Sequence, residues 1–342
     1  MTKVESMKSV NINAELSSDI YEALHGKRAI VTGGTGMIGR EVVRILLDNQ
    51  CDVTSISLDD LKIDERANYV KGDLSNYEFC LDHCNGVDYV FHVAGIKGSV
   101  VVTKEKPASF FVPLLMMNTN MLEAARRNNV QALVYTSSIG AYSAAEVFVE
   151  SDDDFTEPPM DMFPGWAKRM AELQISAYKI QYGLSTYSIV RPSNIYGPGD
   201  NFDDENAMVI PSLMAKMARG DNPVVIWGDG SSERDFLHAT DAAVGVIKAC
   251  IIGTNSKPIN LGCGYGITVK ELVETMQSIH SFEAKFDTAK PAGFSRRIMD
   301  ITQATHQIRF RPKISLKEGL TATWQWYLQN RTSHVSKINY FR

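Results

Sequence analysis

The sequence predicts an α/β fold in which a doubly wound parallel sheet is followed by a smaller C-terminal lobe. Two observations lead to this prediction. Short apolar strands alternate with helical stretches from residue 26 to residue 195, and a glycine-rich turn joins the first strand to the first helix. Strands that alternate with helices form parallel sheets whose crossover helices cover both faces. With 342 residues, the chain is long enough for one large domain or two.

The first half of the chain contains the strands of this sheet. Each has the short apolar character of a buried strand, and the stretches between them carry apolar residues at helical spacing. The expected strands are 28–32, 52–58, 87–93, 133–135 and 186–190, with a further strand that ends before Asp73. The expected helices are 38–46, 107–128 and 165–182. We therefore expect a parallel sheet of roughly seven strands.

The turn after the first strand has the pattern of a dinucleotide-binding site. Glycines at such a turn let the backbone approach a pyrophosphate, and the helix that follows supplies amide donors and the positive end of its dipole. Asp59 lies 20 residues after Gly39, where a carboxylate would accept from the ribose hydroxyls of NAD and repel the 2′-phosphate of NADP. NAD is therefore the expected cofactor, and Asp60 is expected to be an exposed loop residue. The predicted cofactor contacts in this part of the chain are Gly33, Thr35, Gly36, Met37, Ile38, Gly39, Asp59, Asp73 and Leu74.

The second half of the chain is less regular and predicts the smaller lobe. A short helix is expected over 209–217 and a short strand over 224–227. Two later pairs have the spacing of capping boxes, so a helix should begin at each. These pairs are Thr268 with Glu271 and Ser315 with Glu318.

Composition and charge exclude several classes of protein. The chain has 35 basic and 40 acidic side chains and a net charge of −5, which argues against a nucleic-acid partner. The N-terminus lacks the apolar run of a signal peptide, and no stretch is long and apolar enough to span a membrane, so a cytoplasmic location is expected. Five cysteines without a secreted spacing indicate free thiols. We expect structural roles, and no metal site, for Cys80, His83, Cys84 and His92.

Several motifs in the same order resemble the extended short-chain dehydrogenase/reductase family, also called the NAD-dependent epimerase/dehydratase family. They are the glycine turn 32–39, Gly72-Asp-Leu74, Arg191-Pro-Ser-Asn-Ile-Tyr-Gly-Pro198 and Arg234-Asp-Phe-Leu-His238. The resemblance covers about residues 26–330 and is nearest the GDP-fucose synthase branch, through the segments 201–202, 208–213 and 225–230. It implies a Rossmann-type domain, a C-terminal lobe for a nucleotide-activated sugar, and chemistry through a 4-keto sugar.

The same resemblance implies the catalytic residues. Ser138 matches the hydroxyl that holds the substrate oxygen, and Lys168 matches the lysine that binds the nicotinamide ribose and lowers the pKa of a tyrosine. That tyrosine should lie four residues before Lys168, where this chain has Pro164. Proline fits the first turn of a helix but cannot transfer a proton. We favour an altered redox role, and a binding protein without catalysis is the alternative.

Further departures from the family narrow the reaction. Dehydratases of the family carry acidic residues after the catalytic hydroxyl, whereas this chain has Ile139 and Gly140, so a 4,6-dehydratase is not expected. The cysteine and histidine that epimerise in GDP-fucose synthase correspond to Gly140 and Met208, so a 3,5-epimerase is not expected either. Oxidation or reduction at C4 of a GDP-linked hexose or heptose remains, for cell-surface polysaccharide or glycoconjugate biosynthesis. The enzymatic alternative is a 4-epimerase that retains NADH.

Substrate contacts also follow from the resemblance. Arg234 and Arg297 match residues that hold the diphosphate, a role for which guanidinium forks are suited, and Arg296 could replace Arg297. The complete set of predicted substrate contacts is Lys97, Ser99, Ser138, Asn194, Met208, Val209, Arg234 and Arg297.

The predicted organisation has three parts. Residues 26–195 form the NAD-binding domain, to which the chain returns around 235–262, and residues 196–234 and 263–342 form the substrate-binding lobe. Residues 1–25 form an N-terminal extension, docked or frayed. The resemblance further implies a homodimer built from the helices over 107–128 and 165–182.

Overall fold

A computed structural model describes residues 16–96, 98, 100–203, 206–290 and 293–332. The predicted substrate contacts Lys97 and Ser99, and the first part of the N-terminal extension, lie outside these residues.

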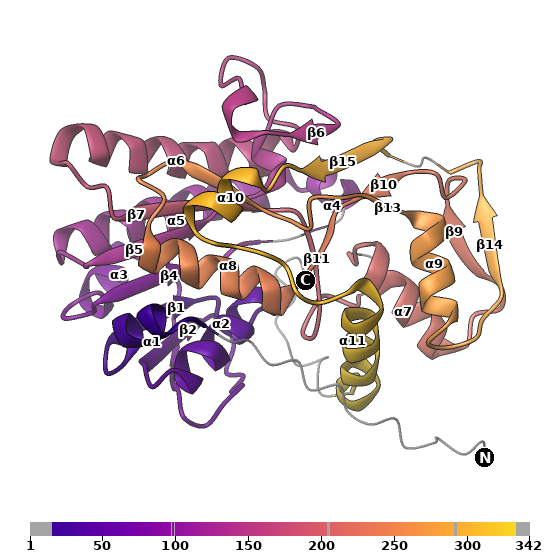
Figure 1. Cartoon of the computed structure of the whole chain (residues 1–342), viewed down its shortest axis with the longest axis horizontal. Coiled ribbons are helices and arrows are strands. Elements are labelled where there is room, and N and C mark those ends of the chain that lie inside the picture. Colours follow the sequence, from indigo (N-terminus) through magenta and orange to yellow (C-terminus); the bar gives the residue numbers. More distant parts are fainter. Residues whose placement is uncertain (1–15, 97, 99, 204–205, 291–292, 333–342) are drawn as a thin grey trace.

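A seven-stranded parallel sheet forms the centre of the molecule (Figure 1). Its order is β12-β7-β5-β4-β1-β2-β3, and every neighbouring pair is parallel. The strands are β1 (Arg28–Thr32), β2 (Asp52–Ser57), β3 (Asn68–Lys71), β4 (Tyr89–His92), β5 (Ala132–Thr136), β7 (Tyr187–Pro192) and β12 (Pro258–Leu261). The strand order reverses between β1 and β4, and open α/β sheets bind ligands at the carboxyl ends of strands at such a point. The predicted fold class is confirmed.

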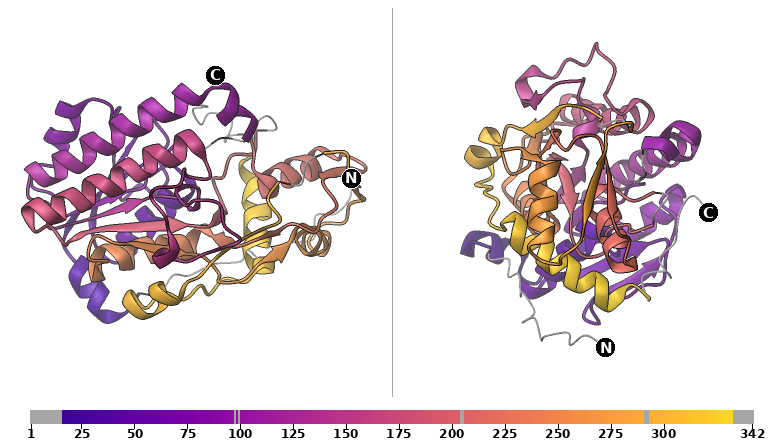
Figure 2. Two further views of the ribbon diagram at one scale, coloured as in Figure 1. Left: turned by 90° about the horizontal axis from the view of Figure 1, so that it is seen from above. Right: turned by 90° about the vertical axis from the view of Figure 1, so that its right-hand side faces the viewer.

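Helices cover both faces of the sheet, because neighbouring residues of a strand point to opposite sides. Ala29 and Val31 of β1 pack in one core with α1 (Ser18–Leu24), α2 (Met37–Asp48), α8 (Ala239–Ile252) and α10 (Thr302–Gln307). Ile30 packs in the other core with α3 (Tyr77–His83), α5 (Pro107–Arg127) and α6 (Met162–Tyr182). The two long helices α5 and α6 lie side by side (Figure 2). A short helix, α4 (Val100–Glu105), precedes α5.

The described part of the N-terminal extension is docked on the sheet layer. Ile20 and Leu24 of α1 are fully buried in the same core as α8. The hydroxyl of Tyr89 donates to the backbone oxygen of Ala23 at 3.1 Å. Helix α1, which precedes the first strand in the chain, is therefore part of the core on this face of the sheet.

A separate apolar core holds together elements from the second half of the chain. These are α7 (Val209–Arg219), β9 (Val224–Trp227), α9 (Val269–Gln277), β14 (Ala284–Asp287) and α11 (Leu316–Asn330). Strand β9 pairs with β14 in parallel. Both predicted capping boxes are present, Thr268 with Glu271 at the start of α9 and Ser315 with Glu318 at the start of α11.

Two small sheets connect this part to the central sheet. One has the order β13-β10-β15-β6. Its strands are β13 (Ile267–Thr268), β10 (Glu233–Arg234), β15 (Arg296–Met299) and β6 (Val147–Phe148). The other pairs β8 (Asn194–Tyr196) with β11 (Phe236–His238) in parallel. Two 3₁₀ turns, η1 (Ile139–Ala141) and η2 (Glu150–Asp152), follow β5. Among the described helices, none combines the length and the apolar character needed to cross a bilayer.

Candidate active site

The glycine turn leaves no room for side chains where a pyrophosphate would approach. Gly33 has a φ of +67°, and a Cβ placed on it would lie 2.8 Å from Cα of Ala94. A Cβ on Gly39 would lie 2.1 Å from the backbone oxygen of Gly33. Helix α2 begins at Met37, and its N-cap residue Gly36 offers no side-chain cap. The first amides of α2 therefore remain available to an anion, as dinucleotide binding requires.

Asp59 lies beside this turn at the carboxyl end of β2. The hydroxyl of Thr35 donates to the carboxylate of Asp59 at 3.1 Å, and its oxygen lies 3.1 Å from the hydroxyl of Ser57, with which it shares a hydrogen bond. Asp60, in contrast, is exposed and forms a surface ion pair of 2.5 Å with Lys71. This arrangement fits the ribose-binding role predicted for Asp59 and the loop role predicted for Asp60.

The remaining predicted adenosine contacts lie after β3. The carboxylate of Asp73 accepts from the amide of Ser75 at 2.9 Å. The side chain of Leu74 is buried in the core beneath α5, so only its backbone is placed to meet a ligand.

Lys168 reaches from α6 to the ends of β4 and β5. Its ammonium donates to the backbone oxygen of Thr136 at 2.7 Å and lies 5.1 Å from the centre of the Tyr135 ring. A Cβ on Gly95, just after β4, would lie 3.7 Å from the same nitrogen. Burial lowers the pKa of Lys168 to about 8, against the opposing effect of Glu172.

A buried chain of polar side chains braces the strands beneath Lys168. Nδ1 of His92 lies 2.8 Å from the hydroxyl of Thr32, and its Nε2 lies 3.0 Å from Oδ1 of Asn118. Asn118 in turn donates to the hydroxyl of Tyr135 at 3.0 Å. Burial lowers the pKa of His92 to about 3, so this ring is neutral at physiological pH. The chain links β1, β4, α5 and β5, which agrees with the structural role predicted for His92.

The two serines after β5 have different environments. Ser137 is buried and donates to Glu172 at 2.5 Å. Ser138 is half-buried and caps η1, where its Oγ accepts from the amide of Gly140 at 3.0 Å. Its hydroxyl proton is free to point towards a substrate. The geometry thus favours Ser138 over Ser137 as the hydroxyl that holds a substrate oxygen.

Pro164 lies in the first turn of α6, where it removes no helical hydrogen bond. Its neighbour Phe163 packs edge-on against Phe111 at 6.1 Å. Neither residue supplies a hydroxyl.

The structure instead brings Asp161 to the turn after Ser138. A Cβ on Gly140 would lie 2.2 Å from Oδ2 of Asp161, so the carboxylate occupies the space of a side chain at position 140. As expected, position 140 itself carries no side chain that could exchange a proton, and the carboxylate beside it comes from another segment. The sequence offered no local signal for Asp161.

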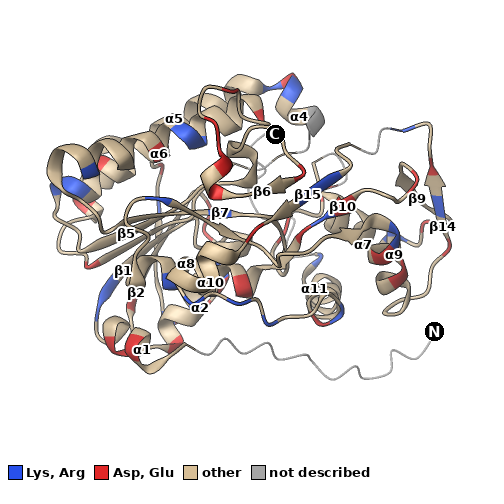
Figure 3. Cartoon of the chain, turned by 45° about the horizontal axis from the view of Figure 1, so that its top comes forward, with Lys and Arg blue, Asp and Glu red and all other residues tan. Residues whose placement is uncertain are grey.

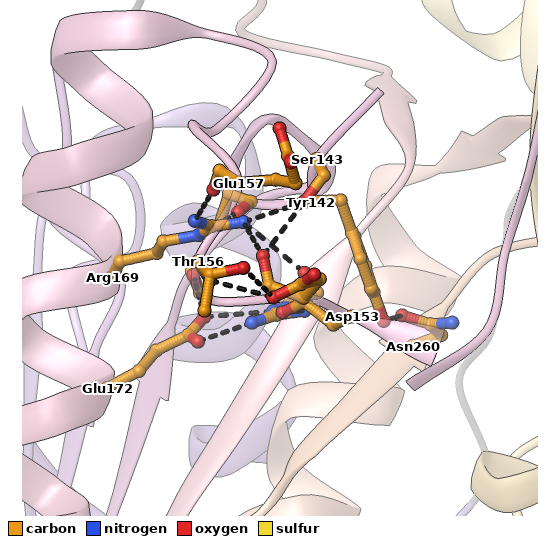
Figure 4. A network of polar contacts seen from close by, with 12 residues as sticks. Tyr142, Ser143, Asp153, Thr156, Glu157, Arg169, Glu172 and Asn260 are labelled. Carbon is orange, nitrogen blue, oxygen red and sulfur yellow. Dashed lines mark hydrogen bonds and ion pairs between the residues drawn. The ribbon is translucent and has the colours of Figure 1, made fainter. Parts of the chain in front are cut away.

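A network of buried charges fixes the segment between η1 and α6 (Figure 4). Arg191 binds Glu172 through two bonds of 2.9 and 2.5 Å and pairs with Asp153 at 2.7 Å. Arg169 donates to the backbone oxygens of Ala141 and Glu157, each at 2.6 Å. Since Arg169 follows Lys168 on α6, the network ties that helix to the loop that carries Asp161.

Arg234 and Arg297 lie on neighbouring strands of the bridging sheet. They are register partners in the parallel pair β10–β15, and Figure 3 colours the ribbon blue where basic residues lie. Burial and the cation of Arg297 lower the pKa of Arg234 to about 10. Nε of Arg297 is buried without a hydrogen-bond partner among the described residues. Arg296 is exposed and paired with Glu233 at 3.1 Å, so Arg297 is the better placed of the two for a diphosphate.

The other predicted substrate contacts lie on β8 and at the start of α7. The side-chain amide of Asn194 donates to the backbone oxygen of Asp235 at 3.1 Å. Asp235 itself is buried and accepts from the hydroxyl of Ser193 at 3.2 Å and the amide of Cys263 at 2.8 Å. Met208 is exposed at the start of α7, and Val209 packs against the core of the lobe.

Comparisons with known proteins agree with this arrangement. The model of the "NAD dependent epimerase/dehydratase family" matches residues 29–262. The GDP-L-fucose synthase of Escherichia coli (strain K12) is 30% identical over 325 residues, which cover 89% of this chain and 98% of the relative. A solved epimerase from Methanothermobacter thermautotrophicus superposes with a TM-score of 0.82 at 23% identity, over 93% of this chain and 97% of the other. The UDP-glucose 4-epimerase of Thermotoga maritima, solved with UDP-glucose, superposes with a TM-score of 0.77 at 27% identity. The match covers 89% of this chain and 99% of the other.

Proposed function

Because this chain belongs to the NAD-dependent epimerase/dehydratase family, we propose that it oxidises or reduces C4 of a nucleotide-activated sugar. A GDP-linked hexose or heptose is the favoured substrate, in the biosynthesis of a cell-surface polysaccharide or glycoconjugate. The observation that supports the proposal best is the set of groups around Gly140. The amide of Gly140 donates to Oγ of Ser138, and the carboxylate of Asp161 lies against the same glycine. The Arg297 cation is close enough to Asp161 to lower the pKa of its carboxyl, against the effect of burial.

The residues present fit NAD at the glycine turn. The glycines are packed too tightly for side chains, the first amides of α2 are uncapped, and Asp59 is held beside them by Thr35. When bound, NAD accepts or donates the hydride of the C4 carbon. In this proposal Lys168 binds the nicotinamide ribose and contributes a positive charge, and Ser138 donates to or accepts from the C4 oxygen.

The other end of the substrate is assigned to the bridging sheet. Two guanidinium groups on adjacent strands match the paired oxygens of a diphosphate. Burial and the neighbouring Arg297 cation lower the pKa of Arg234, and a bound anion would offset both effects. The name of the Escherichia coli relative supports a GDP-sugar. Residues 196–234 and 263–342 are proposed as the substrate lobe and residues 26–195, with 235–262, as the cofactor domain.

Two alternatives follow from specific observations. The likeness to a UDP-glucose 4-epimerase favours epimerisation at C4, which requires the chain to keep NADH while the sugar turns over. Pro164, which replaces the family's tyrosine, favours a protein that binds NAD and a sugar nucleotide without catalysis.

The cofactor and the reaction can be tested with the purified protein. The protein is denatured, the released nucleotide is identified, and fresh protein is incubated with a panel of GDP-, UDP- and dTDP-sugars. NADH absorbance and deuterium exchange at C4 are measured. Bound NAD together with oxidation or exchange on one sugar would support the proposal, and inverted C4 product would favour the epimerase. Tight binding of a sugar nucleotide without exchange across the panel would favour the binding protein.

A further inference from the structure

The structure describes one carboxylate whose position none of the roles above explains. Asp161 lies just before α6, and backbone hydrogen bonds hold it there. The amide of Met160 donates to the oxygen of Tyr142 at 2.7 Å, and the amide of Asp161 donates to the oxygen of Gly140 at 3.2 Å. The segment before α6 is therefore paired with the turn that follows Ser138, and the position of Asp161 is fixed by the fold.

The carboxylate of Asp161 points over this turn. Its Oδ2 lies 2.2 Å, and its Cγ 2.7 Å, from where a Cβ on Gly140 would stand. The amide of the same glycine donates to Oγ of Ser138 at 3.0 Å. Asp161 and Ser138 thus flank a single residue, and glycine at position 140 is what makes room for the carboxylate.

The side chain of Asp161 differs from the neighbouring carboxylates in its hydrogen bonding. Glu172, Asp153 and Asp235 are buried among cations or amide donors. Asp161 is the N-cap residue of α6, yet its side chain makes no cap bond, and no other described residue donates to it. The residue as a whole keeps exposed surface, while its carboxylate is partly desolvated where it lies against Gly140. A carboxylate that stabilises a helix would be expected to accept from the first amides of that helix.

We propose that Asp161 is a catalytic acid–base that replaces the missing tyrosine hydroxyl and exchanges the proton of the sugar C4 oxygen held by Ser138. This rests on the proposed function. In oxidation the O–H bond of the C4 hydroxyl breaks and its proton goes to the carboxylate of Asp161. NAD held at the glycine turn would supply the oxidant: it would accept the C4 hydrogen with its electron pair as hydride, and the C4–O bond would become a C=O bond. Asp161 then returns the proton to water.

The electrostatic surroundings suit this role. Desolvation raises the pKa of Asp161, against the opposing effect of the nearby Arg297 cation. A base works best when its pKa approaches the working pH, so a raised carboxyl pKa improves proton acceptance. Arg297 also links Asp161 to the proposed diphosphate site, so that a sugar nucleotide bound there would have its sugar close to this carboxylate.

The first test compares Asp161→Asn with Glu157→Gln, an exposed neutralisation in the same loop. Single-turnover hydride transfer is measured with the sugar identified for the wild type. Asp161→Asn should slow it about 100-fold or more, while NAD content and GDP affinity by calorimetry stay unchanged. Glu157→Gln should match the wild type. A rate for Asp161→Asn within about twofold of the wild type would overturn the proposal and leave the proposed function standing. A wild type that transfers hydride to or from no sugar would overturn both.

Two more variants separate proton transfer from a structural effect. Gly140→Ala leaves Asp161 in the chain, but its methyl group takes the space that the carboxylate occupies and displaces it. This variant should therefore also slow hydride transfer. Adding Pro164→Tyr to Asp161→Asn supplies the hydroxyl at the position where the family has it, and should restore part of the rate. Infrared difference spectra of the NAD-bound wild type minus Asp161→Asn should show a carboxyl that titrates above the ordinary range of aspartate. A carboxyl in the ordinary range, with no rescue by tyrosine, would count against the proposal.

Discussion

Arg234 and Arg297 are direct neighbours in the parallel register of β10 and β15. Burial disfavours the Arg234 cation most, and the like charge of Arg297 on the neighbouring strand adds to this effect. The lowered pKa of Arg234 has these two causes. Such a pair gains the most when a doubly charged anion binds across both guanidinium groups.

Removing one of these charges should therefore weaken nucleotide binding. Arg297→Met should lower the affinity for GDP roughly 10- to 100-fold, since a hydrogen bond to a charged group contributes about 1.5–3 kcal/mol. Isothermal titration calorimetry with GDP measures this directly. Arg296→Met is the matched control, because Arg296 is exposed and already paired with Glu233. Equal losses in the two variants would assign the diphosphate elsewhere.

The state of Lys168 predicts a pH dependence. Its pKa of about 8 lies below the ordinary value for lysine because burial disfavours the cation. The charged fraction falls as the pH rises through about 8, so hydride transfer that depends on this cation should decline on the basic side. Lys168→Arg keeps a charge at all accessible pH values, and its profile should lose that basic limb. Rates measured from pH 6 to pH 10 test this, and identical basic limbs in the two proteins would contradict it.

Much of this site follows from local sequence, because short segments determine it. The glycine turn, the start of α2 and the placement of Ser138 after β5 all depend on residues close together in the chain. Apolar spacing also predicted the strands and the long helices, since one buried face is enough to reveal them.

The remaining features depend on how distant segments meet. Asp161 approaches Gly140 only because the segment before α6 pairs with the turn after β5. Arg234 meets Arg297 because β10 and β15, far apart in the chain, become neighbours in the bridging sheet. Such contacts have no periodicity to reveal them, so the residue types at positions 139 and 140 gave no sign of the carboxylate that lies beside them.

The buried ion pair between Arg191 and Glu172 should dominate the stability of the site. Glu172→Gln leaves the Arg191 cation in a buried environment with one fewer carboxylate, and should lower the free energy of unfolding by about 3 kcal/mol. Urea unfolding followed by circular dichroism measures the change. Asp19→Asn removes an exposed partner of Arg309 and should cost less than about 1 kcal/mol. If Glu172→Gln lowered the free energy of unfolding as little as Asp19→Asn, the buried pair would not be needed to hold the loop.

The outer surface of α5 and α6 predicts a homodimer. Ile180 and Leu173 of α6 lie two helical turns apart on one face and expose 84% and 46% of their surface. Val112 and Met116 form a similar exposed pair, one turn apart, on the adjacent helix α5, at 49% and 45%. Packing this face against a second copy would bury all four side chains in a bundle of four helices.

Light scattering can test this assembly in solution. The wild type should have the mass of two chains, and Leu173→Glu/Ile180→Glu should have the mass of one, because charges on both turns cannot be buried in an apolar interface. Leu328→Glu changes a comparably exposed leucine, 44% accessible, on α11 and should remain dimeric. A wild-type mass of one chain, or a double variant that stays dimeric, would place any subunit contact away from α5 and α6.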